Sequence, residues 1–212
     1  MAGPMSSLGE LAHHRIIPVV IIDDAERAAD LALALAAGGI HCAEITLRTP
    51  AALAAISAMA SIPDFTVGVG TVLSRDQLRS SIDAGASFVV TPGFDPELVG
   101  SAVENGVAVL PGIATATEAM AALRAGIDVV KFFPADRLGG LDTIRALAAP
   151  LPQLRFVPSG GVTERSAVDY LGDSAVFAVS GSWMAPRALI DAGSFDEIER
   201  LSSATVAAIG AK

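Results

Sequence analysis

Cysteine is almost absent from this chain of 212 residues, which contains only Cys42. One cysteine excludes an internal disulfide framework and is typical of a reducing compartment, so we expect a cytoplasmic location. Long apolar runs are missing as well. The longest stretch without a charged residue, Thr49–Pro63, is too short to span a membrane, and Met1–Arg15 has no apolar core of a signal peptide. The sequence therefore predicts a protein with no membrane partner.

Positive charge and aromatic side chains are also scarce. The chain has 14 Lys and Arg residues against 23 Asp and Glu residues, a formal net charge of −9 and 5% aromatic residues. Nucleic acids and anionic membranes are bound by basic patches, so this balance argues against both as partners. A small anionic substrate responds to local charge and is still allowed.

Apolar residues are abundant and follow a repeat. They make up 52% of the chain and are mainly Ala, Val, Leu and Ile, with a mean hydropathy of +0.55. A short apolar run is followed each time by a polar turn and an Ala- and Leu-rich helix pattern. The eight runs are Ile16–Ile22, Cys42–Leu47, Thr66–Thr71, Phe88–Thr91, Val107–Leu110, Val129–Phe133, Arg155–Ser159 and Ala175–Ser180.

Strands that alternate with helices indicate a parallel sheet, because parallel neighbours need a crossover connection. Eight such units favour a closed (β/α)8 barrel, although an open doubly wound sheet is an alternative. We expect residues 1–212 to form one domain, with a short helix in Ser6–His14 and a last helix in Asp196–Ala211. Helix starts are predicted at Thr49–Pro50, at Asp95–Pro96, and at capping boxes that begin with Ser74 and Thr115.

Only two of the 14 basic residues are lysines, Lys131 and the terminal Lys212. Lys131 lies within the apolar run Val129–Phe133, where strand alternation places it on one face with Val129 and Phe133. A buried ammonium group is costly, and burial favours the neutral amine, which is the form that attacks a carbonyl. Lys131 is therefore a candidate imine-forming nucleophile. A lysine in a structural ion pair is the alternative.

The second run, Cys42–Leu47, also carries polar residues on one face. Alternation groups Glu44 and Thr46 with Arg48, and polar groups inside a barrel need partners or a ligand. A buried Glu suits proton transfer, and an Arg at the carboxyl end of a strand can bind a carboxylate with two hydrogen bonds. A structural salt bridge among Glu44, Arg48 and Lys131 is the alternative.

Glycine-rich turns follow the last two runs, as Ser159-Gly160-Gly161 and Gly181-Ser182-Trp183. Glycine allows backbone N–H groups to approach an anion, and the loops after the seventh and eighth strands of such barrels often bind phosphate. Ordinary connecting turns are the alternative.

The sequence contains no cluster of His, Cys, Asp or Glu residues with the spacing of metal ligands. His13, His14 and His41 are far from any carboxylate cluster with metal-ligand spacing, so we expect no metal site. Cys42 is interpreted as a small buried apolar residue.

Taken together, these residues resemble the 2-keto-3-deoxy-6-phosphogluconate (KDPG) and 4-hydroxy-2-oxoglutarate aldolase family, from about Ile17 to the last helix. The motifs that carry the resemblance are Glu44-Ile45-Thr46-Leu47-Arg48, Gly68-Val69-Gly70-Thr71-Val72-Leu73, Thr91-Pro92-Gly93, Pro111-Gly112-Ile113-Ala114-Thr115, Lys131-Phe132-Phe133-Pro134-Ala135, Pro158-Ser159-Gly160-Gly161 and Gly181-Ser182-Trp183.

The resemblance implies a class I aldolase that needs no cofactor and no metal, and that forms a homotrimer. Lys131 forms a Schiff base with the keto carbon of the substrate, and Glu44 moves protons through a water. The reaction implied is cleavage of a phosphorylated keto acid, 2-dehydro-3-deoxy-6-phosphogluconate, to pyruvate and glyceraldehyde 3-phosphate, with 4-hydroxy-2-oxoglutarate as a candidate second substrate. Arg48 and Thr71 bind the pyruvate carboxylate, Pro92 and Phe133 line the pocket, and Ser159, Gly160, Gly161 and Ser182 receive the phosphate.

Two positions depart from the family pattern, since Ser159 stands where threonine is common and Ser180 where glycine is common. The turn Gly181-Ser182-Trp183 favours the gluconate substrate over the galactonate epimer. A 2-dehydro-3-deoxy-6-phosphogalactonate aldolase, another phosphate-binding barrel enzyme such as a sugar-phosphate epimerase, and a non-catalytic barrel that binds phosphorylated ligands are the alternatives.

Overall fold

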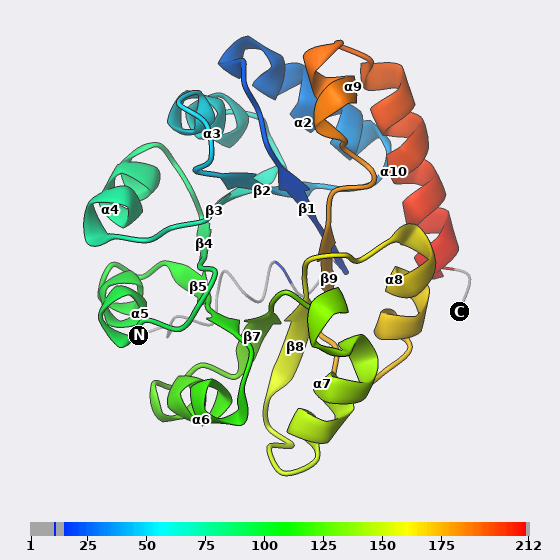
Figure 1. The fold of residues 1–212 in the computed structure, drawn as a ribbon. Coiled ribbons are helices and arrows are strands. Elements are labelled where there is room, and N and C mark those ends of the chain that lie inside the picture. Colours follow the sequence, from blue (N-terminus) through cyan, green and yellow to red (C-terminus); the bar gives the residue numbers. More distant parts are fainter. Residues whose placement is uncertain (1–10, 12–14, 211–212) are drawn as a thin grey trace.

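A ring of parallel strands surrounded by helices makes up the computed structural model, which describes Leu11 and residues 15–210 (Figure 1). The strands are β1 (Ile16–Val20), β2 (Cys42–Thr46), β3 (Thr66–Gly70), β4 (Phe88–Val90), β5 (Ala108–Leu110), β6 (Gly112–Ile113), β7 (Val129–Phe132), β8 (Arg155–Pro158) and β9 (Val179–Gly181). The α-helices are α2 (Ala28–Ala37), α3 (Ala52–Ala60), α4 (Arg75–Asp83), α5 (Pro96–Glu104), α6 (Ala116–Arg124), α7 (Gly140–Ala148), α8 (Glu164–Leu171), α9 (Arg187–Asp191) and α10 (Phe195–Gly210), with short 3-10 turns at Ala25–Arg27 and Asp136–Leu138.

The strands follow the order β5-β4-β3-β2-β1-β9 in one sheet and β6-β7-β8 in a second. β5 and β6 share the fifth barrel position on either side of Pro111, which has no N–H to donate to a ladder. Two single bridges, Phe156 with Val176 and Ser159 with Ser180, close the ring between β8 and β9. The predicted (β/α)8 barrel is confirmed, and the open sheet is excluded.

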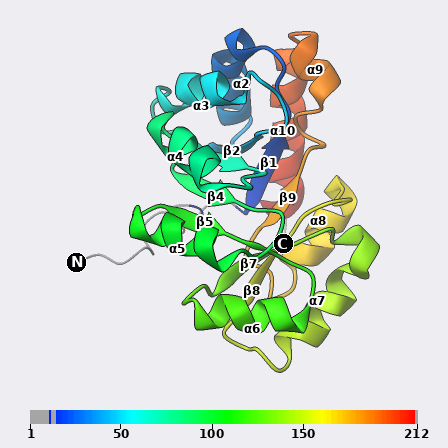
Figure 2. The same cartoon turned by 60° about the vertical axis from the view of Figure 1, so that its left-hand side comes forward.

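Strand alternation divides the apolar side chains into two sets. Interior side chains such as Ile17, Val129 and Val157 fill the barrel, whereas Val130 and Phe132 pack outward against the helices. The turned view in Figure 2 shows α2, α3 and α10 on one side of the strands and α6 and α7 on the other. Among the helices of residues 15–210, none is long and apolar enough to cross a membrane.

Most of the predicted helix starts are confirmed. Asp95 caps α5 with Pro96 in its first turn, and Thr115 forms a reciprocal capping box with Glu118. Ser74 caps α4 by accepting a hydrogen bond from the Gln77 backbone N–H, but the capping box predicted there is incomplete, because the Gln77 side chain accepts from the Leu73 backbone N–H instead.

Three other local predictions are wrong. Thr49 does not cap α3, because its hydroxyl donates instead to the carbonyl of Ile22. β6 was not expected, and the last strand begins at Val179 rather than near Ala175. The N-terminal helix predicted in Ser6–His14 lies outside the described residues, except for the buried, helical Leu11. That residues 1–212 form a single domain stays a prediction.

Candidate active site

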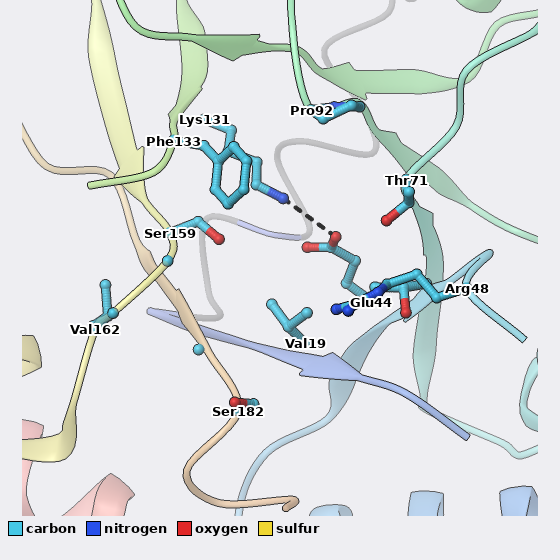
Figure 3. Close-up of a pocket in the computed structure, with 14 residues that line it drawn as sticks. Val19, Glu44, Arg48, Thr71, Pro92, Lys131, Phe133, Ser159, Val162 and Ser182 are labelled. Atoms are coloured by element: carbon cyan, nitrogen blue, oxygen red, sulfur yellow. Dashed lines mark hydrogen bonds and ion pairs between the residues drawn. The ribbon is translucent and has the colours of Figure 1, made fainter. Parts of the chain in front are cut away.

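A cavity of about 400 Å³ opens where the barrel strands end at their carboxyl termini (Figure 3). Seven strands or the loops that follow them contribute to its wall. The lining residues are Val19, Glu44, Thr46, Arg48, Thr71, Pro92, Lys131, Phe133, Ser159, Gly160, Gly161, Val162, Gly181 and Ser182. The structure thus brings all ten residues predicted for the site together in one cavity, in the position where barrel enzymes carry out their chemistry.

Lys131 and Glu44 face each other across the cavity, from β7 and β2. Nζ of Lys131 lies 3.5 Å from Oε1 of Glu44, and the two residues are 7% and 1% exposed. The ammonium group also lies 5.2 Å from the centre of the Phe133 ring. At 3.5 Å the Lys131–Glu44 contact is long for a charge-assisted hydrogen bond, so it leaves both groups able to bind another partner.

The Glu44 carboxylate lies over the backbone of β3. A Cβ atom at Gly70 would collide with Oε1 of Glu44, so only glycine leaves room for the carboxylate there. The second oxygen, Oε2, is buried and has no hydrogen-bond partner among the described residues. A buried carboxylate oxygen without a partner costs free energy, which a bound water or substrate group would recover. Glu44 is therefore suited to exchange protons with a ligand.

Arg48 and Thr71 lie on the β2–β3 side of the cavity (Figure 3). Arg48 follows the end of β2 and is exposed, and its guanidinium makes no hydrogen bond or ion pair with the residues that the structure describes. Thr71 follows β3 with a φ of 63°, a left-handed conformation that is strained for a β-branched residue by ~1–3 kcal/mol. Its hydroxyl points into the cavity. A carboxylate placed here would meet a cation and a hydroxyl donor.

The opposite wall is formed by the loops after β8 and β9. Gly160 and Gly161 have φ values of 89° and 79°, which favour glycine, and a Cβ at Gly161 would collide with Asp136. Ser182 lies on the neighbouring loop after β9 and lines the same cavity (Figure 3). Loops of this kind present backbone N–H groups and a hydroxyl to an anion.

Trp183 holds the loop after β9 against the last helix. Its indole Nε1 donates a 3.0 Å hydrogen bond to Oγ1 of Thr205 on α10, and its ring covers Gly181 so closely that a Cβ there would collide with it. Trp183 therefore positions the loop that carries Ser182 and does not line the cavity itself.

Four lining residues were not among the predicted site residues. Val19 and Val162 gave no chemical signal in the sequence, whereas Gly181 belongs to the glycine turn Gly181-Ser182-Trp183, which indicates anion binding. Thr46 shares its strand face with Glu44, but its hydroxyl donates to the Val20 carbonyl at 2.9 Å and thus joins β2 to β1.

Other candidates lie away from the cavity. Cys42 is fully buried at the foot of β2, and burial raises the pKa of its thiol well above the usual range. No group of three or more His, Cys, Asp or Glu residues in the described part of the chain is arranged to hold a metal ion. His13 and His14 lie outside the described residues.

Comparison with known proteins gives consistent matches along the chain. A family model described as KDPG and KHG aldolase matches residues 9–201. The 2-dehydro-3-deoxy-phosphogluconate aldolase of Treponema pallidum (strain Nichols) is 46% identical over 197 residues, which cover 92% of this chain and 94% of that relative.

Two solved structures superpose with a TM-score of 0.90. One is the 2-keto-3-deoxy-6-phosphogluconate aldolase of Zymomonas mobilis ZM4 with 3-phosphoglycerate, which is 38% identical, with 96% of each chain covered. The other is KDPG aldolase from Legionella pneumophila with pyruvate captured at low pH as a covalent carbinolamine intermediate. It is 36% identical, with 96% of this chain and 98% of that chain covered.

Proposed function

The chain belongs to the KDPG and KHG aldolase family, and on that premise we propose that its cavity cleaves 2-dehydro-3-deoxy-6-phosphogluconate to pyruvate and glyceraldehyde 3-phosphate. The observation that carries the proposal is the pair formed by Lys131, the only lysine before the last residue, and the buried Glu44 at 3.5 Å. A second substrate of the same site is 4-hydroxy-2-oxoglutarate.

The reaction begins with the amine of Lys131. Once its proton has passed to Glu44, the neutral amine attacks the keto carbon C2 and forms a carbinolamine. Loss of water, with a proton supplied from Glu44, gives a protonated imine. Because the two groups already face each other inside the cavity, no large rearrangement of side chains is needed.

Carbon–carbon cleavage then uses the imine as an electron sink. The Glu44 carboxylate, through a water, accepts the proton of the C4 hydroxyl while the C3–C4 bond breaks. The bonding electrons move into the imine to give an enamine, and glyceraldehyde 3-phosphate leaves. Protonation of the enamine at C3 and addition of water at C2 then release pyruvate and free Lys131.

The substrate lies across the cavity in one direction. Arg48 and Thr71 bind the carboxylate, and Pro92 and Phe133 line the space around the reacting carbons. Gly160, Gly161 and Ser182 bind the phosphate. The resemblance groups Ser159 with the residues that receive the phosphate. Because its hydroxyl points into the cavity between the two ends (Figure 3), we assign it instead to the hydroxyl-bearing middle of the substrate.

The proposal also includes the location and the oligomeric state of the enzyme. The single cysteine supports a cytoplasmic location. The family resemblance supports a homotrimer. Light scattering of the purified protein measures the mass of the assembly, and a monomeric mass would contradict the trimer.

A cleavage assay tests the function. We expect pyruvate release, followed with lactate dehydrogenase and NADH, from the gluconate substrate at a higher kcat/KM than from its C4 epimer, the galactonate substrate. Exhaustive EDTA treatment should leave the rate unchanged. Absence of pyruvate from both epimers would contradict the proposed function, and a loss restored by Zn²⁺ or Mg²⁺ would point to a metal-stabilised enolate.

A further inference from the structure

Ser180 places a hydroxyl inside the barrel that the mechanism above does not use. The residue is 1% exposed, and its Oγ has no hydrogen-bond partner among the described residues. Ala178, two positions earlier, belongs to the apolar set inside the barrel, whereas Val179 packs toward the helices. Because side chains alternate along a strand, Ser180 faces the barrel interior.

The neighbour of Ser180 on β8 is a residue of the cavity. Ser180 and Ser159 are bridge partners where the barrel closes, and Ser159 faces the same interior side because Val157 does. Adjacent strands lie about 4.8 Å apart, so rotation of the two side chains brings their hydroxyls within the ~2.8 Å of a hydrogen bond.

A buried hydroxyl without a partner is unfavourable, and such groups are rare in folded proteins. We propose that Ser180 is a positioning residue whose hydroxyl donates to Oγ of Ser159 when substrate is bound, so that Ser159 directs its own proton to a substrate oxygen. The inference rests on the proposed function. In such a chain each hydrogen bond strengthens the next, because a hydroxyl that accepts a hydrogen bond is polarised and becomes a better donor itself.

The role is confined to one part of the substrate. Ser159 lies between the Lys131–Glu44 pair and the loops after β8 and β9, so its hydroxyl has no partner on free pyruvate. Imine formation with pyruvate should therefore be independent of Ser180, whereas cleavage of the full substrate should depend on it.

The chain contains a matched control. Ser202 on α10 is likewise fully buried, and its Oγ has no partner among the described residues, but it packs against Gly38 on the outside of the barrel. Ser180→Ala and Ser202→Ala remove the same group, one beside the cavity and one far from it. Both should keep or raise Tm, because each removes an unpaired buried hydroxyl.

The experiment measures kcat/KM for the phosphorylated substrate and the rate of borohydride trapping with pyruvate, in wild type, Ser180→Ala, Ser159→Ala, the double variant and Ser202→Ala. We expect Ser180→Ala to lower kcat/KM about 3- to 10-fold, the range for one hydrogen bond, with trapping unchanged. In the Ser159→Ala background, Ser180→Ala should have no further effect.

Three results would overturn the inference: wild-type kcat/KM in Ser180→Ala, additive losses in the double variant, or an equal loss in Ser202→Ala. Failure of the wild-type protein to trap pyruvate or to cleave the substrate would instead contradict the proposed function. The two failures are therefore distinguishable.

Discussion

The lower and the upper part of the barrel interior use the same strands for opposite purposes. We define the lower layer as Cys42, Val129, Val157 and Ala178, and the upper layer as Glu44, Lys131, Ser159 and Ser180. Each residue of the upper layer follows its lower-layer counterpart by two positions, within a strand or at its end. One step along the interior face thus changes an apolar core into a polar site.

The difference between the two layers allows a small barrel to bury charged groups and remain stably folded. The lower layer and the helix-facing set of apolar residues stabilise the fold, so the upper layer is free to carry groups that cost stability. Two of the three buried polar atoms that have no partner among the described residues, Oε2 of Glu44 and Oγ of Ser180, belong to the upper layer. Changes in the upper layer should therefore affect activity, and changes in the lower layer should affect stability.

The largest effect is expected at Lys131. Lys131→Cys removes the only side-chain amine among the described residues that line the cavity, so kcat should fall by about 10⁴-fold or more. Alkylation of the introduced thiol with 2-bromoethylamine restores an amine and should recover a measurable part of the rate. Cys42 should not react under native conditions because its thiol is buried. A variant that retains a hundredth of wild-type turnover without alkylation would contradict the role of Lys131.

Glu44→Gln should have the next largest effect. The amide keeps the size of the side chain but cannot accept a proton, so kcat should fall by about 10²–10⁴-fold, the range for a positioned acid or base. Slow trapping of pyruvate on Lys131 should persist, which separates proton transfer from imine formation. Wild-type turnover in this variant would mean that Glu44 is only the ion-pair partner of Lys131.

Removal of the substrate phosphate should lower the activity less than substitution of Lys131 or Glu44 does. Hydrogen bonds to a charged acceptor contribute ~1.5–3 kcal/mol each, and part of that energy orients the substrate. An unphosphorylated analogue should therefore lose about 10²-fold in kcat/KM. Ser182→Ala should lose about 10-fold on the phosphorylated substrate only. Equal losses on both substrates would indicate that the loop after β9 shapes the barrel without binding phosphate.

The smallest effect on activity is expected in the lower layer. Cys42→Ala should lower the free energy of unfolding by about 1–2 kcal/mol, because it leaves a small cavity in the core, and should change kcat/KM by less than about 2-fold. Chemical denaturation and the cleavage assay measure the two quantities. A tenfold loss of kcat/KM at unchanged stability would contradict the division between the layers.

Much of the fold could be predicted because its signals are local. Each of these signals involves residues only a few positions apart in the sequence. Examples are the apolar runs, the proline at the start of α5 and the Thr115–Glu118 capping box. The break at Pro111 could not be placed, because it depends on which neighbour each half of the strand pairs with. The failure of Thr49 to cap α3 could not be predicted either, because it depends on a tertiary contact. The Thr49 hydroxyl donates to the carbonyl of Ile22, which follows the preceding strand β1.

The site was predictable to the extent that its residues are out of place in a core. Lys131 and Glu44 stand out because charges are rare in apolar strands. Val19 and Val162 line the cavity without any signal, since an apolar residue beside a cavity has the same pattern as one in the core. The contact between Ser159 and Ser180 depends on how the barrel closes, which no local pattern specifies.

Reductive trapping tests the central claim, a Schiff base on Lys131, most directly. The protein is incubated with pyruvate and sodium borohydride, and the mass of the intact chain and of its peptides is measured. One reduced pyruvyl group per chain, located on the peptide that contains Lys131, is the predicted result. Label on Lys212 or the amino terminus alone, or no label at all, would contradict the account.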